Sequence, residues 1–392
     1  MVLDMVKDKV IKRDGSLVEF DKDKIKSAIS NAFIEIDGML DDKSNDIINR
    51  ISDSIEGLNK ELTVENIQDI VENKLMASNR KDIAKAFMIH REKRKMVREA
   101  LKRDEGILSL IKGTNDELNV ENSNKNATLV TTQRDYIAGE VSKDLVRRYN
   151  FFPKEVMDAH DEGLIHLSDL DYQIQPIHNC ELINLEDMLQ NGTVINGIKI
   201  DKPNSFSTAC TIATQIIVQV TSNSYGGATI SLAHLSPFIQ TTRDKLKKDW
   251  GDKLSDEDIE KLVRKDIASG IQTIQYQLVT ISGTNGQSSF LSLFMYINEV
   301  KDEQGKKDLA VAIEEVLRQR ILGVKNEQGV YISTAFPKLL YVLDENNITE
   351  DSEYWYLTKL SAECTTKRLV PDYISAKKMV EYKEGNVFPC IN

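Results

Sequence analysis

The segment from residue 163 to residue 185 decides the fold of the larger part of the chain. It reads Gly163-Leu164-Ile165-His166-Leu167-Ser168-Asp169-Leu170-Asp171-Tyr172 and continues, after five further residues, with His178-Asn179-Cys180-Glu181-Leu182-Ile183-Asn184-Leu185. The run from Cys180 to Leu185 predicts a short β-strand, and the polar residues before it predict a turn. Because α/β proteins place their chemistry at strand ends and in the adjoining loops, this turn is a candidate site.

Four side chains of this segment are of types that bind metals: His166, Asp169, His178 and Cys180. Their spacing matches no closed zinc signature, and Asp169 and His178 could instead cap backbone groups. We therefore expect no metal here.

Outward from this segment, residues 128–392 mix helical and strand patterns. Helices are predicted over Asp135 to Tyr149, Pro153 to Glu162, Ser255 to Ser282 and Gly305 to Leu322, and a strand over Lys338 to Leu343. This mixture predicts an α/β fold. The Asp- and Lys-rich stretch from Arg243 to Lys265 is typical of a solvated helix face, and we assign it no function.

The first hundred residues predict a small separate unit. Val10 and Ile11 lead into the turn Arg13-Asp14-Gly15, and Val18 and Phe20 return from it, which predicts a β-hairpin. Helical spacing follows around Ile25, Ile48, Ile67 and, from Ile83 to Met96, in a last helix; Thr63 is the expected N-cap of the third. The polar stretch from Lys112 to Asn126 is the best linker candidate, so we expect domains at 1–100 and 128–392, joined by 101–127.

The composition and net charge of the chain disfavour several classes of function. The 392 residues carry a net charge of −11, which disfavours broad attraction to nucleic acid or to anionic membranes. No apolar run is long enough for a membrane span, and no signal peptide is visible, so we expect a cytoplasmic protein. Four cysteines, Cys180, Cys210, Cys364 and Cys390, are too few and too scattered for a disulfide framework.

Several cations surround the predicted hairpin turn. Lys12 and Arg13 flank it, and Lys24 falls in the first turn of the following helix. Cations beside backbone N–H groups at a turn or helix start can bind phosphate groups. Taken alone, these few residues are better explained by an ordinary charged hairpin, so they do not establish a phosphate site.

The whole N-terminal pattern resembles the ATP-cone, the allosteric nucleotide-binding module of ribonucleotide reductases. The residues that carry the resemblance are Val10-Ile11-Lys12-Arg13-Asp14-Gly15, Val18-Glu19-Phe20-Asp21, Lys24-Ile25, Ala28-Ile29, Thr63 and Ala86-Phe87-Met88-Ile89-His90-Arg91. The resemblance implies that ATP or dATP binds near Val10, Lys12 and Arg13, with Lys24 on the phosphates and Thr63 near the base or sugar. His90 and Arg91 could add phosphate contacts, or could simply belong to a solvated helix.

The rest of the chain resembles the anaerobic (class III) ribonucleoside-triphosphate reductases, which are glycyl-radical enzymes. The resemblance rests on the segment 163–185 and on Ser205–Thr211, Ser222–Gly227, Ala362–Thr365 and Arg368–Tyr373. It implies that residues 128–392 form part of a ten-stranded α/β barrel, and that the complete enzyme reduces ribonucleoside triphosphates to deoxyribonucleotides with formate as reductant.

The second resemblance also implies roles for single residues. Cys180, in Asn-Cys-x-Leu-Ile, matches the cysteine that lies against the substrate 2′ position, and a thiol S–H bond is weak enough for hydrogen-atom transfer. His166 matches a histidine that could contact ribose hydroxyls, although Ser168 stands where the family usually has a second histidine. The small-residue stretch of Ser222, Ser224, Gly226 and Gly227 could approach a phosphate or ribose closely, or could be a packed turn. Cys210 and Cys364 should pack as small apolar residues.

Near its last residue the chain holds Phe388-Pro389-Cys390, which resembles the start of the family's finger-loop motif with Cys390 as its first cysteine. By resemblance, the glycyl radical and a zinc module belong to a further C-terminal portion, and the partners are a radical-SAM activating enzyme and a second copy in a homodimer. We expect the 392-residue chain alone to bind nucleotide without forming product. The alternative is a non-catalytic ATP- or dATP-binding fragment.

Overall fold

The computed structural model describes residues 9–13, 15–56, 58, 62–112, 114, 128–284, 286–385 and 387, without the side chains of 99, 102, 103 and 106. The chain divides into two compact units, Met1–Glu105 and Gly106–Asn392. Cys390 lies outside the described residues, as do most residues of the expected linker.

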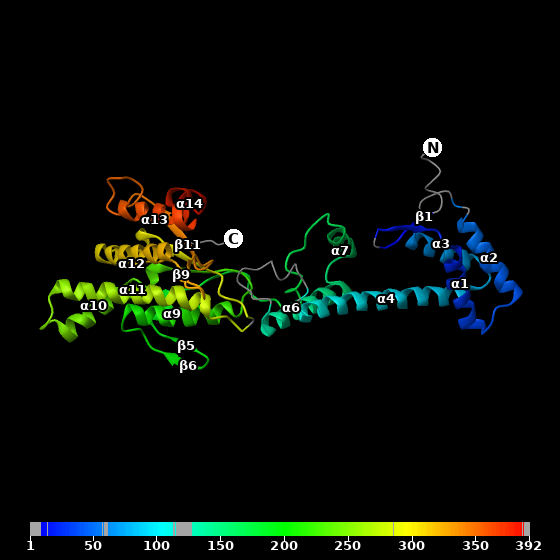
Figure 1. Cartoon of the computed structure of the whole chain (residues 1–392), viewed down its shortest axis with the longest axis horizontal. Helices are drawn as coiled ribbons and strands as arrows, with labels where there is room; N and C mark the ends of the chain where they lie inside the picture. Colours follow the sequence, from blue (N-terminus) through cyan, green and yellow to red (C-terminus); the bar gives the residue numbers. More distant parts are fainter. Residues whose placement is uncertain are drawn as a thin grey trace. The chain divides into compact units, whose positions relative to one another are not determined.

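The N-terminal unit combines a three-stranded sheet with helices. The sheet has the order β2-β1-β3, with β1 (Lys9–Ile11) antiparallel to β2 (Leu17–Glu19) and parallel to β3 (Leu62–Thr63). The helices are α1 (Lys22–Asp37), α2 (Asp42–Glu56), α3 (Val64–Ala77) and α4 (Lys81–Lys112) (Figure 1). Their buried apolar residues, Ile29, Phe33, Ile55 and Leu75 among them, form one core. The predicted hairpin and helices are therefore confirmed.

Helix α4 continues beyond the predicted end at Met96. It ends at Lys112 and so includes the first twelve residues of the expected linker, 101–127. Residues with good helix propensity, such as Leu101 and Leu108, extend the helix, and its last turn holds Lys112, whose charge complements the helix dipole.

The C-terminal unit is built on a five-stranded parallel sheet of order β12-β11-β8-β7-β4. These strands are β4 (Glu181–Leu182), β7 (Ala228–Ser231), β8 (Leu291–Met295), β11 (Lys338–Leu343) and β12 (Asp372–Ser375). Two small hairpins, β5–β6 (Thr193–Ile195, Ile198–Ile200) and β9–β10 (Val324–Lys325, Tyr331–Ile332), lie outside it. An α/β fold with a parallel sheet is confirmed; within the described residues the sheet has five strands and does not form a ten-stranded barrel.

Helices link and cover these strands. They are α6 (Val130–Arg148), α7 (Lys154–Asp161), α8 (Leu185–Gln190), α9 (Phe206–Thr221), α10 (Pro237–Trp250), α11 (Asp256–Thr280), α12 (Glu303–Leu322), α13 (Trp355–Arg368) and α14 (Ala376–Tyr382), with 3₁₀ turns η1 (Leu232–His234) and η2 (Ile297–Glu299). Helix α11 contacts both α9 and α12 (Figure 1). The main core takes alternate residues from the strands, such as Ile230, Leu293 and Tyr341, so one face of the sheet packs against this helical layer.

The expectation of a wholly solvated face from Arg243 to Lys265 is wrong at its first residue. Arg243 is only 8% exposed and donates from Nη2 to Asp308 Oδ1 at 2.6 Å and from Nη1 to Asp308 Oδ2 at 3.0 Å. Glu260 accepts a further bond from Arg243 Nε. A buried charge requires such partners, and Asp308 on α12 supplies one that a local charge pattern cannot indicate.

Candidate functional site

The N-terminal unit contains a cavity of about 250 Å³ between the hairpin, α1 and α3. Its floor is apolar, and its lining brings together three of the residues predicted to bind nucleotide, Val10, Lys12 and Lys24. The other lining residues are Val18, Glu19, Phe20, Asp21, Ile25, Ala28, Val64, Ile67, Gln68, Val71 and Phe87. An apolar slot with lysines at its edge suits a flat aromatic base with an attached anion.

Local structure fixes the backbone around both lysines. The Lys12 N–H donates to Ser16 O at 2.8 Å across the hairpin turn, where Gly15 has a φ of +79°. Asp21 caps α1 and accepts from the Lys24 N–H at 3.3 Å. The Lys24 ammonium lies 3.3 Å from Asp21 Oδ2, and its side chain is 82% exposed. Exposed ion pairs of this kind are weak, so Lys24 is available to a phosphate group.

Thr63 and His90 lie outside the lining of this cavity. Thr63 is the N-cap of α3, as predicted: its hydroxyl accepts from the Asn66 N–H at 3.0 Å, and Asn66 Oδ1 accepts from the Thr63 N–H at 3.2 Å. The next residue, Val64, does line the cavity. His90 is exposed on α4.

Arg13 and Arg91 line a separate groove of about 730 Å³, to which α3 contributes Glu65 and Glu72. Glu65 bridges them, since one carboxylate oxygen accepts from Arg13 Nε at 2.5 Å and the other from Arg91 Nη2 at 2.7 Å. Arg91 also pairs with Asp69 at 2.7 Å and with Glu72 at 3.0 Å. Burial opposes ionisation of Glu65, but the two guanidinium groups outweigh it and lower its pKa.

In the C-terminal unit, two of the predicted segments lie side by side as neighbouring strands. The Tyr225 N–H donates to His178 O at 3.1 Å and the Glu181 N–H to Gly227 O at 2.9 Å, so Cys180 lies between two rungs of this ladder. A Cβ on Gly226 would come within 2.1 Å of Asn179 O, and this close approach requires glycine. Cys180 is exposed, whereas Cys210 and Cys364 are buried, as predicted.

The serines of this stretch differ in their surroundings. Ser222 Oγ donates to Val218 O at 2.7 Å and so belongs to the end of α9. Ser224 is 1% exposed, and its hydroxyl has no hydrogen-bond partner within the described part of the chain.

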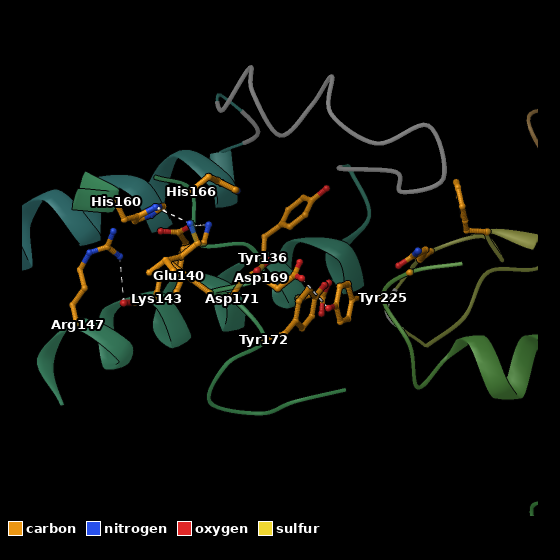
Figure 2. Close-up of a pocket in the computed structure, with 17 residues that line it drawn as sticks. Tyr136, Glu140, Lys143, Arg147, His160, His166, Asp169, Asp171, Tyr172 and Tyr225 are labelled. Carbon is orange, nitrogen blue, oxygen red and sulfur yellow. Dashed lines mark hydrogen bonds and ion pairs between the residues drawn. The ribbon is translucent and has the colours of Figure 1, made fainter. Parts of the chain in front are cut away.

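A cavity of about 760 Å³ lies beside these strands and contains His166 (Figure 2). One face of α6, the start of the 163–185 segment and the turn before β7 form it. The lining residues are Asp135, Tyr136, Gly139, Glu140, Lys143, Arg147, His160, His166, Leu167, Asp169, Leu170, Asp171, Tyr172, Tyr225, Gly226, Gln287 and Phe290. Cys180 is not in this lining, but Gly226, whose backbone lies against that of Asn179, is.

Specific contacts shape this cavity. The Tyr225 hydroxyl donates to Asp169 Oδ2 at 3.0 Å, and the rings of Tyr225 and Tyr172 stack with centroids 4.2 Å apart (Figure 2). Burial and the bond to Asp169 raise the pKa of Tyr225 to about 12. At the other side, the rings of His160 and His166 are 5.7 Å apart, and the Leu167 N–H donates to His160 Nδ1 at 3.2 Å. That bond leaves the proton of neutral His160 on Nε2.

The sequence did not single out the residues that α6 and α7 contribute, such as Lys143, Arg147 and His160. A signal existed for two of them, because Lys143 and Arg147 are four residues apart and share one face of a helix. Tertiary packing determines which face of α6 lies against residues 163–172, so a local sequence pattern could not show it. Among the described residues, no group of three or more His, Cys, Asp or Glu side chains is placed to hold a metal ion, and no helix is long and apolar enough to cross a membrane.

Comparison with known families covers both units. The anaerobic ribonucleoside-triphosphate reductase family model matches residues 121–390, and the ATP cone domain model matches residues 8–96. These matches confirm the two resemblances seen in the sequence.

Curated relatives extend the similarity along almost the whole chain. Anaerobic ribonucleoside-triphosphate reductases of Haemophilus influenzae and of Escherichia coli are each 32% identical over 95% of this chain and 52% of their own length. The solved anaerobic ribonucleotide reductase of Thermotoga maritima in complex with dATP and CTP is 16% identical over 70% of this chain and 46% of its own, with a TM-score of 0.48. The chain thus spans about half the length of the curated relatives, and it belongs to the anaerobic ribonucleoside-triphosphate reductase family.

Proposed function

We propose that the N-terminal unit binds ATP or dATP as an allosteric effector. The observation that carries this proposal is the cavity in which an apolar floor meets the ammonium groups of Lys12 and Lys24. The adenine ring packs against apolar residues such as Val10 and Phe87, and the phosphates lie at the lysine edge. The match of residues 8–96 to the ATP cone domain supports this assignment.

Calorimetry of the whole chain with ATP and dATP tests this proposal. Removing a hydrogen bond to a charged group costs about 1.5–3 kcal/mol, so the double variant Lys12→Ala/Lys24→Ala should bind at least about tenfold more weakly. Lys26→Ala, on the same helix but outside the cavity lining, is the matched control. Equal affinity of the wild-type chain and the double variant would reject the assignment.

We further propose that the C-terminal unit contributes to reduction of ribonucleoside triphosphates by radical chemistry, with Cys180 and His166 at the ribose. The exposed thiol of Cys180, in the strand beside Gly226, supports this role. The enzyme would use formate, a glycyl radical generated by a radical-SAM activating enzyme, and a homodimeric assembly in which this unit forms part of a ten-stranded barrel. Any role of Cys390 belongs to the same proposal.

Cys180→Ser tests this second part in an enzyme completed with the residues that the longer relatives carry beyond the matched half. The hydroxyl cannot donate a hydrogen atom as readily as the thiol, so deoxynucleotide formation should be abolished. Binding of ATP by the N-terminal unit should be unchanged. Substantial turnover by Cys180→Ser would show that this cysteine has no role in the reduction, and the alternative of a nucleotide-binding fragment would then be favoured.

A further inference from the structure

Tyr225 connects the two segments of the C-terminal unit that carry the side chains proposed to act on the ribose. Its backbone N–H donates to His178 O at 3.1 Å, in the strand ladder that contains Cys180. Its hydroxyl donates to Asp169 Oδ2 at 3.0 Å, three residues after His166 (Figure 2). One residue is therefore bonded both to the segment of Cys180 and to the segment of His166.

The backbone at Asp169 requires support from its surroundings. Asp169 has a φ of +59°, in the left-handed region, where a residue other than glycine is strained and must be held by its neighbours. The Asp169 carbonyl accepts from the Tyr172 N–H at 3.0 Å, which closes a tight turn. The ring of Tyr172 stacks on that of Tyr225, with centroids 4.2 Å apart and an angle of 12° between the planes. The Tyr225 side chain thus contacts both ends of this turn.

Contacts on both flanks tie the same turn to neighbouring helices. Ser142 of α6 is buried and donates from its hydroxyl to Leu170 O at 2.9 Å. On the other flank, the Leu167 N–H donates to His160 Nδ1 of α7 at 3.2 Å. These bonds hold the turn against α6 and α7, whereas the hydroxyl of Tyr225 holds it against the strand ladder.

We propose that Tyr225 is a positioning residue for the reduction: by holding Asp169, it keeps the His166 imidazole at a constant position relative to the Cys180 thiol. This inference rests on the proposed function, in which both side chains act on the ribose. Reacting groups must be held to within about 0.5 Å of a productive geometry, and a misplacement of about 1 Å can slow a reaction by about a hundredfold. The sequence indicated only a small-residue stretch over 222–227, without a role for its tyrosine.

Hydrogen exchange of the whole chain tests the contact without requiring turnover. Tyr225→Phe retains the stacked ring and removes only the bond to Asp169. Exchange over residues 166–172 should become about two- to tenfold faster, the change expected for one lost hydrogen bond, while β8 and β11 keep their rates. Tyr373→Phe is the matched control, because its hydroxyl lies 2.8 Å from Thr365 Oγ1 and outside the cavity lining; it should leave 166–172 unchanged.

Two results of this measurement would overturn the proposal. Unchanged exchange over residues 166–172 in Tyr225→Phe would show that the hydroxyl does not hold the turn. Faster exchange throughout the unit, with β8 and β11 included, would show that Tyr225 supports overall stability and not this segment in particular.

Steady-state kinetics test the positioning role in an enzyme completed with the residues that the longer relatives carry beyond the matched half. Tyr225→Phe should lower kcat by about tenfold to a hundredfold with little change in KM, because the bond affects alignment more than binding. Asp169→Asn tolerates the left-handed backbone and keeps an oxygen that accepts from Tyr225, so it should lose less kcat. Asp169→Gly removes the acceptor, and adding Tyr225→Phe to it should lower kcat little further.

The outcomes separate this role from the proposed function. A raised KM with unchanged kcat in Tyr225→Phe, or losses that multiply in the double variant, would reject the positioning role. If Cys180→Ser abolishes turnover while Tyr225→Phe has the kcat of the wild type, the positioning role is wrong and the proposed function stands. Substantial turnover by Cys180→Ser would reject the proposed function and, with it, this role of Tyr225.

Discussion

Arg13 Nε donates to Glu65 Oε1 at 2.5 Å, and this bond holds the arginine of the hairpin turn against the start of α3. Arg13 also donates from Nη2 to Gln68 at 3.2 Å, and Gln68 lines the proposed nucleotide cavity. Arg13 thus lies at the border between the cavity and the groove that contains Arg91. A phosphate bound beside Lys12 would compete with Glu65 for this guanidinium.

Glu65→Gln should therefore raise the affinity of the N-terminal unit for ATP and dATP. The change removes the charge that competes for Arg13, and exposed pairs of this kind contribute about 0.2–1 kcal/mol, so the affinity should rise by a factor of about 1.4 to 5. Calorimetry of the whole chain measures it. Glu72→Gln, which affects Arg91 but not Arg13, is the control and should leave affinity unchanged. Weaker binding by Glu65→Gln would mean that Glu65 supports the site.

The three described cysteines should differ in reactivity. Cys180 is exposed, whereas Cys210 is completely buried, and its burial raises the pKa of its thiol well above the ordinary value. Because alkylation requires an accessible thiolate, Cys180 should be modified fully in the native chain before Cys210 or Cys364 reacts. Peptide-resolved mass spectrometry before and after unfolding measures this order. Modification of Cys210 in the native chain at the rate of Cys180 would contradict the packing of α9.

The buried pair of Arg243 and Asp308 joins α10 to α12. Arg243→Met should destabilise the chain by about 3–5 kcal/mol, because it leaves the Asp308 carboxylate without its main partner in a buried site. The double variant Arg243→Met/Asp308→Leu removes both charges and should recover a large part of that loss. Urea unfolding measures all three free energies. A double variant no more stable than Arg243→Met would show that the two residues do not act as a pair.

Features set by neighbouring residues could be predicted from the sequence. The hairpin around Gly15 follows from turn chemistry, and the N-cap at Thr63 follows from its spacing to Asn66, so both were recognisable without tertiary information. The strand from Lys338 to Leu343 was found with its observed ends, because a short apolar run is a strong local signal.

Features that depend on distant partners could not be predicted in the same way. Arg243 is the first residue of a charged stretch whose composition is typical of a solvated helix face. Its partner Asp308 comes sixty-five residues later in the sequence. The pairing of the Cys180 strand with the stretch around Gly226 depends on sheet order, which no local pattern determines. For the same reason the sequence assigned Arg13 and Lys12 to one site, whereas the structure puts their side chains in different cavities.

We propose that one chain carries two separate nucleotide sites, an effector site in the N-terminal unit and a substrate site at His166 and Cys180 in the C-terminal unit. Hydrogen exchange of the whole chain with dATP alone and with CTP alone tests this claim most directly, because protection reports where each ligand binds. The predicted result is slower exchange with dATP over residues 9–28 and 64–71, and with CTP over residues 163–185. Protection of the same residues by both nucleotides, or protection by dATP confined to the C-terminal unit, would contradict it.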